Sequence, residues 1–199
     1  MTLPTLKPAG QLLVPVPLFL GTARRVIPVI LIVAGVSGSG KTTVGALVAG
    51  RLRWRFADAD TFHPAANVAK MRSGTPLTDA DRVPWLHAIR AWMDREIADG
   101  NSAVVTCSAL KRAYREELLT GRPAATMVFL LVGRDVLERR LLARPDHFFP
   151  EKLLDSQLAA LEPPAPGEGI ETVVSEGDAA QTAAKVIATV WPYGEPGTA

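Results

Sequence analysis

The amino-acid sequence predicts an α/β fold in which a five-stranded parallel sheet carries helices on both faces. From Val26 onward, short apolar runs rich in β-branched residues alternate with longer segments of helical periodicity. Apolar strands that alternate with helices are typical of parallel sheets buried on both faces. The length of 199 residues, of which 48% are hydrophobic, suits a single domain with one sizeable core.

The individual elements follow from the apolar runs and from the residues that start and stop helices. Pro64 is a favoured first residue of a helix, and Gly74 ends that helix. Thr78 and Asp81 resemble a capping box for a long helix that Gly100 closes. The predicted strands cover residues 29–34, 55–57, 102–106, 126–132 and 170–174. The other predicted helices cover residues 41–52, 111–119, 134–143, 150–161 and 179–190.

The chain divides into one folded domain and two flanking segments. Residues 1–25 are expected to form a disordered extension, because the prolines that recur there oppose regular structure. Residues 26–192 form the expected domain, and residues 193–199 a carboxyl-terminal tail.

Composition and charge exclude several classes of protein. A net charge of +2 gives little non-specific attraction to nucleic acid, so no nucleic-acid partner is expected. The longest apolar stretch, residues 26–36, is too short to cross a bilayer, and no membrane partner is expected. Residues 12–20 resemble a signal-peptide core but are interrupted by prolines. The single cysteine, Cys107, cannot form an intrachain disulfide, which fits a reducing, cytoplasmic location.

A glycine-rich loop between the first predicted strand and the first predicted helix indicates nucleotide binding. Residues 35–42 match the pattern G-x-x-x-x-G-K-[ST], in which backbone N–H groups and the helix N-terminus bind phosphate. Lys41 can reach the β- and γ-phosphates, and the Thr42 hydroxyl is suited to Mg²⁺. The motif predicts a phosphate-loop (P-loop) NTPase fold and leaves the phosphate acceptor open. The expected nucleotide-binding residues are Gly35, Val36, Ser37, Gly38, Ser39, Gly40, Lys41, Thr42 and Thr43.

Two carboxylates follow the second predicted strand. Asp58 and Asp60 emerge at the carboxyl edge of the sheet, beside the phosphate loop. One of the two can hold Mg²⁺ through water while the other accepts a hydroxyl proton; we assign the metal to Thr42 and Asp58 and the proton to Asp60. A solvated acidic turn is the alternative interpretation.

Further motifs follow in a fixed order. They are Asp-Ala-Asp-Thr-Phe-His-Pro at residues 58–64, Asn67, Lys70-Met71, Gly-Thr-Pro-Leu-Thr-Asp at 74–79, Asp-Arg-Val-Pro-Trp-Leu at 81–86, Cys-Ser-Ala-Leu-Lys at 107–111, Tyr114-Arg115, the segment 140–144, His-Phe-Phe at 147–149, and Gln157 with Leu-Glu-Pro at 161–163. In this order, over about residues 29–190, they resemble the gluconokinases, small-molecule kinases related to shikimate and nucleoside-monophosphate kinases. The resemblance implies ATP-dependent phosphorylation of D-gluconate to 6-phosphogluconate, a shikimate- or adenylate-kinase-like sheet with a closing lid, and usually a homodimer.

The chemistry of gluconate suggests roles for these motif residues. Its carboxylate needs a cation, for which Arg82 and Lys111 are the candidates, and its hydroxyls need donors and acceptors. Trp85 is either an apolar wall for the sugar chain or a core residue. The expected substrate-binding residues are Asp60, His63, Lys70, Arg82, Trp85, Lys111, His147 and Gln157.

Two arginines on one predicted helix are candidates for phosphate contacts. Arg140 and Arg144 share a helix face and precede the His147 loop, where the related kinases carry lid arginines. A solvated face is the alternative to a role in neutralising the transferred phosphate. The expected catalytic residues are Asp60, Lys41, Arg140 and Arg144.

Some features leave other functions open. Thr106-Cys107-Ser108 stands where many phosphate-loop enzymes carry an acidic residue, and Pro145-Asp146 stands where related lids often have a basic or glycine pair. A kinase for another acceptor, such as shikimate or a nucleotide, is one alternative. A regulatory GTP-binding switch or an ATP-driven interaction module is another, although no Asn-Lys-x-Asp guanine-reading motif occurs in the sequence.

Overall fold

The computed structural model describes residues 27–143 and 151–191 of the chain. The expected extension over residues 1–25 and the expected tail over residues 193–199 lie outside the described residues. Within the described ranges, no helix is long and apolar enough to cross a membrane.

Five parallel strands form one sheet with the order β2-β3-β1-β4-β5. The strands are β1 (Ile30–Ala34), β2 (Arg55–Asp58), β3 (Ala103–Cys107), β4 (Ala125–Leu131) and β5 (Glu171–Val174). Each differs from its predicted range by no more than one residue at either end. The side chains of β1 are all buried at the centre, whereas the edge strands β2 and β5 are partly exposed. The predicted fold class is therefore confirmed.

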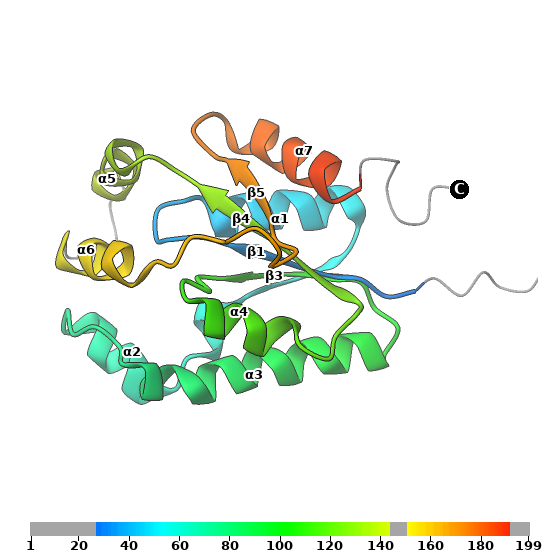
Figure 1. Ribbon diagram of the computed structural model, residues 1–199, viewed down its shortest axis with the longest axis horizontal. Helices are drawn as coiled ribbons and strands as arrows, with labels where there is room; N and C mark the ends of the chain where they lie inside the picture. Colours follow the sequence, from blue (N-terminus) through cyan, green and yellow to red (C-terminus); the bar gives the residue numbers. More distant parts are fainter. Residues whose placement is uncertain (1–26, 144–150, 192–199) are drawn as a thin grey trace, which may run out of the picture.

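Helices cover both faces of the sheet and form three layers with it (Figure 1). The helices of the described residues are α1 (Lys41–Leu52), the short 3₁₀ helix η1 (Ala59–Phe62), α2 (Ala65–Arg72), α3 (Asp79–Ala98), α4 (Arg112–Leu119), α5 (Arg134–Leu142), α6 (Glu151–Ala160) and α7 (Ala179–Val190). One face carries α1 and α7, and the other carries α3 and α4 (Figure 1). The remaining helices, α2, α5 and α6, lie beyond the end of the sheet to which the strand arrows point (Figure 1).

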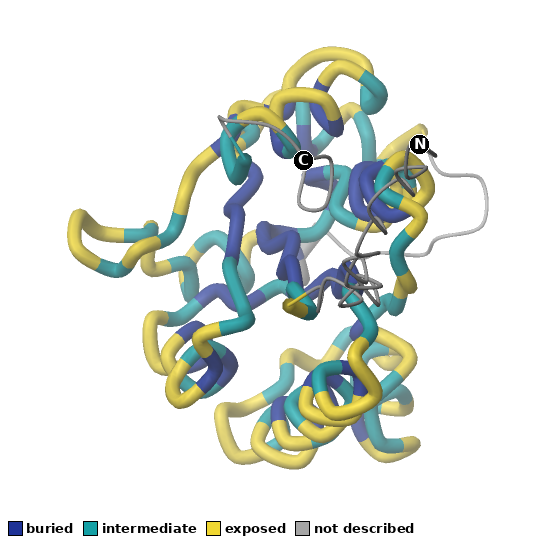
Figure 2. Tube along the Cα trace, turned by 90° about the vertical axis from the view of Figure 1, so that its right-hand side faces the viewer, coloured by how far each residue is buried: buried dark blue, intermediate teal, exposed yellow. Residues whose placement is uncertain are grey.

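The core is divided between the two faces of the sheet because successive side chains of a strand point to opposite sides. From β1, Ile30 and Ile32 pack with Ile89 of α3, while Leu31 packs with Val48 of α1. Figure 2 shows the buried segments running through the interior and the exposed segments around it. Both faces of the sheet are therefore closed, and its carboxyl edge is left to form a site.

The two predicted helix starts have different outcomes. The capping box of α3 is present, because the Asp81 N–H donates to Thr78 Oγ1 over 3.2 Å and the Thr78 N–H donates to Asp81 Oδ2 over 2.8 Å. The start of α2 at Pro64 is wrong by one residue. The helix begins at Ala65, and the carbonyl of Pro64 caps it by accepting from the Asn67 N–H. Proline suits this cap because it has no N–H that needs a partner.

Candidate active site

The phosphate loop lies between the buried strand β1 and the start of α1, as the motif predicts. Gly35, Gly38 and Gly40 have φ values of 144°, 81° and 94°, which L side chains rarely adopt. A Cβ atom at Gly35 would lie 2.7 Å from a serine hydroxyl oxygen of the same loop, so no larger residue fits there. The Lys41 ammonium donates to the Val36 carbonyl over 3.0 Å. The backbone thus has the curled form in which N–H groups can surround a phosphate.

A hydroxyl and a carboxylate meet directly beside this loop. The Thr42 hydroxyl donates to Asp58 Oδ2 over 2.7 Å, and the other oxygen, Oδ1, accepts from the Asp60 N–H over 3.1 Å. Hydroxyl and carboxylate oxygens are the hard ligands that Mg²⁺ prefers, so the two residues fit the predicted metal site. Asp58 is the last residue of β2 and not a loop residue. The bond that its side chain accepts from the Asp60 N–H caps the N-terminus of η1.

Asp60 is exposed on η1 and lies in a group of charges around the end of β3. Burial raises the pKa of the Cys107 thiol to about 12, and the charges of Asp60, Lys41 and Asp58 all act on the same thiol. Because the thiol is buried and protonated at neutral pH, it packs in the core and is not suited to act as a nucleophile.

His63 and Trp85 form a stacked pair beneath η1. Their ring centroids are 4.5 Å apart with an interplanar angle of 8°. Trp85 is 1% exposed, and its indole N–H donates to the Ala59 carbonyl over 2.7 Å, which favours the core alternative over a wall that contacts substrate. Desolvation lowers the pKa of His63, so its imidazole is neutral at neutral pH. Its Nδ1 is buried with no hydrogen-bond partner among the described residues, as expected for a polar atom that contacts a ligand or water.

The two cations predicted to bind a carboxylate both face Asp79. Lys111 donates to both oxygens of Asp79 over 2.8 Å, and an Arg82 nitrogen lies 3.9 Å from Oδ1. The Tyr114 hydroxyl also donates to Oδ1, over 2.5 Å. These hydrogen bonds, with that from Lys111 foremost, lower the pKa of Asp79. Burial raises the pKa of Tyr114 to about 12, so its hydroxyl remains a donor at neutral pH.

Asp79 and Tyr114 are functional candidates that the sequence analysis did not select. Both lie in quoted motifs, and the spacing of Tyr114 three residues after Lys111 places the two side chains near one another at the start of α4, which Lys111 precedes. That spacing is the signal that indicates Tyr114. The local neighbour of Asp79 is Arg82, three residues later, whereas its hydrogen-bond donors lie 32 and 35 residues further along the chain and give no local signal.

Lys70 reaches the start of α3. Its ammonium lies 2.6 Å from Asp81 Oδ1, the oxygen of the capping-box carboxylate that the Thr78 hydroxyl and N–H leave available. These contacts, with that from Lys70 foremost, lower the pKa of Asp81. The structure therefore places Lys70 at the first turn of α3, where Asp81 holds its ammonium.

Arg140 of α5 lies against the other side of the phosphate loop. Its guanidinium donates to the carbonyls of Ser39 and Gly177 over 3.3 and 3.4 Å, and the Ser175 hydroxyl donates to the same Ser39 carbonyl over 3.1 Å. A cavity of about 320 Å³ lies here between Gly40, Arg140 and the segment that joins β5 to α7. The sequence analysis missed this segment. A polar turn directly after the last strand, at the same sheet edge as the loop, is the signal that indicates it.

Gln157 of α6, which the sequence analysis predicts to contact substrate, contacts the phosphate loop. Its Oε1 accepts from the Ser37 N–H over 2.7 Å, so α6 and the loop are in direct contact. Arg144 and His147, the remaining predicted site residues, lie outside the described residues.

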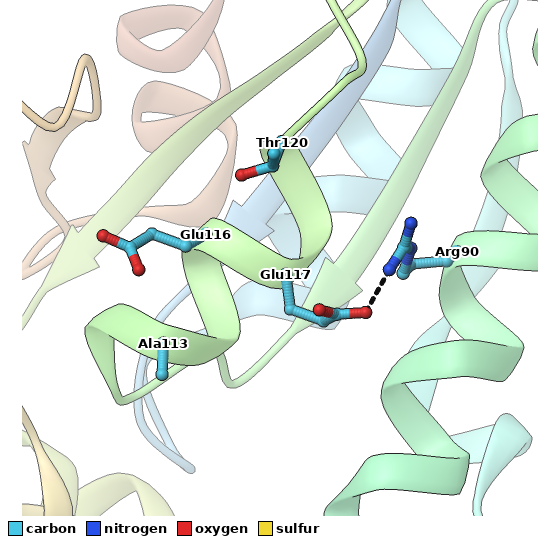
Figure 3. Close-up of a pocket in the computed structure, with 5 residues that line it drawn as sticks. All are labelled: Arg90, Ala113, Glu116, Glu117 and Thr120. Atoms are coloured by element: carbon cyan, nitrogen blue, oxygen red, sulfur yellow. Dashed lines mark hydrogen bonds and ion pairs between the residues drawn. The ribbon is translucent and has the colours of Figure 1, made fainter.

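A second pocket, of about 280 Å³, lies on the outer side of α4 (Figure 3). Arg90 of α3 points across it and pairs with Glu117. Glu116, Ala113 and Thr120 complete the lining. It contains none of the predicted site residues, and its two carboxylates make it unsuited to a phosphate.

A glycine-rich loop after the central strand of a five-stranded parallel sheet, with a pair of carboxylates at the end of edge strand β2, defines a phosphate-loop kinase. A family model described as an AAA domain matches residues 30–164. The chain belongs to the gluconokinase family: it is 48% identical to the gluconokinase of Gluconobacter oxydans over 75% of this chain and 84% of that protein.

Other similar proteins agree with this assignment. The chain is 41% identical to the thermoresistant gluconokinase of Escherichia coli, with 70% of this chain and 79% of that protein covered. The crystal structure of a gluconokinase from Sinorhizobium meliloti matches with a TM-score of 0.70 and 36% identity, over 85% of this chain and 99% of that one. Shikimate kinase from Aquifex aeolicus, with a TM-score of 0.52 and 18% identity over 82% of this chain and 96% of that one, shares the fold.

Proposed function

We propose that this protein is an ATP-dependent gluconokinase, which transfers the γ-phosphoryl group of ATP to the C6 hydroxyl of D-gluconate and releases 6-phospho-D-gluconate and ADP. One observation carries the proposal: the phosphate loop after β1, the Asp58–Asp60 pair at the end of β2 and Lys111 after β3 share one edge of the sheet. Their strands are neighbours in the order β2-β3-β1, so the carboxyl ends meet. Relatives named gluconokinases, 40–48% identical, support gluconate as the acceptor.

ATP binds on the phosphate loop in this proposal. The backbone N–H groups and the N-terminus of α1 bind the phosphate oxygens, and Lys41 neutralises charge on the β- and γ-phosphates. Arg140, already in contact with the Ser39 carbonyl, approaches the same phosphates, and Arg144 is proposed to do so with it. Thr42 and Asp58 would hold Mg²⁺, which supplies further neutralisation of phosphate charge when bound.

Gluconate binds between η1 and the start of α4. Arg82 and Lys111 bind its carboxylate, and His63, Lys70 and Gln157 are proposed contacts for its hydroxyls and for the phosphoryl group. His147 is proposed to join them. Trp85 acts by holding His63 in place, since the two rings are stacked and Trp85 itself is buried.

Asp60 is the proposed general base. Its exposed carboxylate lies next to the Thr42–Asp58 pair, where it can orient the C6 hydroxyl and accept its proton while that oxygen attacks the γ-phosphorus in line. Lys41 and Arg140 stabilise the negative charge of the phosphoryl group and of the departing ADP oxygen. Transfer to a hydroxyl needs no covalent intermediate with the enzyme, which agrees with the buried thiol of Cys107.

The direct test is ATP consumption in the presence of a panel of acceptors. ADP release is measured with D-gluconate, other aldonic acids, shikimate and nucleoside monophosphates, each with Mg²⁺ present and absent. D-gluconate is expected to give the highest kcat/KM, with a product whose phosphorus signal couples to the C6 protons. Greatest activity with shikimate or a nucleotide would identify another small-molecule kinase. Hydrolysis that responds to a protein partner but to no sugar acid would support a regulatory switch.

We also propose that the enzyme is a cytoplasmic homodimer. The resemblance to gluconokinases supports the dimer, and the buried lone cysteine fits a reducing compartment. Light scattering on the purified chain measures its mass against the monomer mass of 21.3 kDa.

A further inference from the structure

The cluster formed by Arg82, Lys111, Tyr114 and Asp79 has three largely shielded donors and one exposed acceptor. The side chains of Arg82 and Lys111 are 18% and 29% exposed, and Tyr114 is buried. Arg82 is anchored further by its hydrogen bond to the Leu77 carbonyl, over 2.7 Å. The side chain of Asp79 is 63% exposed, so its carboxylate can turn away from the donors into water.

The position of the donors matches that of the carboxylate site proposed for gluconate. Both cations assigned to the substrate carboxylate already face a carboxylate, and the Tyr114 hydroxyl adds a neutral donor to the same oxygen. The ammonium of Lys111 donates to both oxygens of Asp79. A substrate carboxylate that binds Lys111 must therefore compete with Asp79 for it.

We infer that Asp79 occupies the substrate-carboxylate position in the free enzyme, and that a sugar acid binds by exchanging its carboxylate for that of Asp79 at Lys111 and Tyr114. The inference rests on the proposed function and makes Asp79 a specificity-determining residue. With Asp79 in place, the donors stay ordered and the positive charges of Arg82 and Lys111 are partly neutralised. The exchange therefore weakens the binding of carboxylate ligands and leaves neutral polyols unaffected, because a polyol has no carboxylate to exchange.

The test compares the binding of D-gluconate and of D-glucitol, its neutral analogue, to the wild type and to Asp79→Asn by calorimetry. The dissociation constant of D-gluconate is expected to fall about fivefold in the variant, the scale of one exposed ion pair, while that of D-glucitol stays the same. A weaker D-gluconate complex in the variant would overturn the inference, because Asp79 would then serve only to position Lys111. Asp79→Ser, which suits a helix start, replaces the variant if Asp79→Asn does not fold.

A second experiment asks whether the Tyr114 hydroxyl, which donates to Asp79 in the free enzyme, donates to the substrate carboxylate in the complex. Tyr114→Phe is expected to weaken D-gluconate binding even in the Asp79→Asn background. If the hydroxyl served Asp79 alone, Tyr114→Phe would have no effect in that background, and the inference would be wrong.

Asp94→Asn is the matched control, because Asp94 lies on the same helix and accepts two hydrogen bonds of 2.7 Å from Arg122. Its D-gluconate affinity is expected to equal that of the wild type. Failure of the proposed function is a separate result: a wild type that consumes no ATP with D-gluconate removes the basis of the inference. A wild type that does so but binds D-gluconate more tightly than Asp79→Asn overturns the inference alone.

Discussion

Asp58 and Asp60 are separated by a single residue, yet their environments differ. Both oxygens of Asp58 accept hydrogen bonds, one from the Thr42 hydroxyl and one from the Asp60 N–H. The carboxylate of Asp60 is exposed at the edge of the site. A carboxylate held at both oxygens is suited to fix a cation beside the phosphate loop, whereas an exposed one can approach a substrate hydroxyl.

Replacement of the exposed carboxylate tests this division at the scale of one residue. Asp60→Asn removes the proton acceptor but keeps the size and the backbone of η1, so kcat with D-gluconate is expected to fall about 10²- to 10⁴-fold. The dissociation constant of a fluorescent ATP analogue is expected to change little. Asp99→Asn, an exposed aspartate at the far end of α3, serves as the control and is expected to keep full turnover. Turnover near that of the wild type in Asp60→Asn would contradict the assignment of the base.

At the scale of elements, Arg115 joins α4 to the segment before it and to the loop between α6 and β5. Its buried guanidinium donates to both oxygens of Glu168 over 2.8 and 3.0 Å, and to the carbonyls of Leu110 and Glu162 over 3.0 and 2.8 Å. These bonds hold the segment between β3 and α4, in which Ala109 has a φ of 41°. Lys111 comes directly after this segment, so Arg115 fixes the backbone from which Lys111 extends.

Loss of this arginine is expected to destabilise the protein strongly. Arg115→Met leaves Glu168, whose side chain is 6% exposed, buried without its cation, and the free energy of unfolding is expected to fall by about 3–5 kcal/mol. Urea unfolding followed by circular dichroism measures the change. The contrasting variant is Arg112→Ala, which breaks an exposed pair with Glu116 on the same helix and is expected to cost at most about 0.5 kcal/mol. Equal losses in the two variants would show that burial does not govern the effect.

The sequence predicts those features that depend on neighbouring residues. The ranges of α1 and α7 agree with their predictions, and the capping box at Thr78 is found because its two partners lie three residues apart. The phosphate loop is found because its motif is a run of consecutive residues, 35–42. The hydrogen-bond donors to Asp79 come from α4 and the residue before it, and Arg115 bonds to a loop 47 to 53 residues away, so no local pattern indicates these contacts. The role of a long-range contact emerges only once the helices are packed.

At the scale of the whole molecule, the stability of the fold depends on several ionised carboxylates. Hydrogen bonds lower the pKa values of Asp79, Asp81, Asp94 and Glu168, with Lys111, Lys70, Arg122 and Arg115 as the leading cause in each case. A carboxyl group with a lowered pKa in the folded state contributes stability above its unfolded pKa. That contribution is lost as the pH falls through the folded pKa.

Acid is therefore expected to destabilise the protein progressively below about pH 4.5, the ordinary pKa of a glutamic acid. Glu168→Gln is expected to be less stable than the wild type near neutral pH but to lose less stability on acidification, because one of the titrating groups is absent. Urea unfolding at a series of pH values measures both slopes. Parallel curves for the wild type and the variant would exclude Glu168 as a source of the acid sensitivity.

The strand order also constrains when the enzyme becomes functional during its synthesis. β1 carries the phosphate loop and is made early, but its two neighbours in the sheet begin at Ala103 and Ala125. A nascent polypeptide that has not yet emerged as far as β4 leaves one side of β1 without backbone partners. The ribosome must therefore release the chain at least as far as Leu131 before the strand that carries the phosphate loop is paired on both sides.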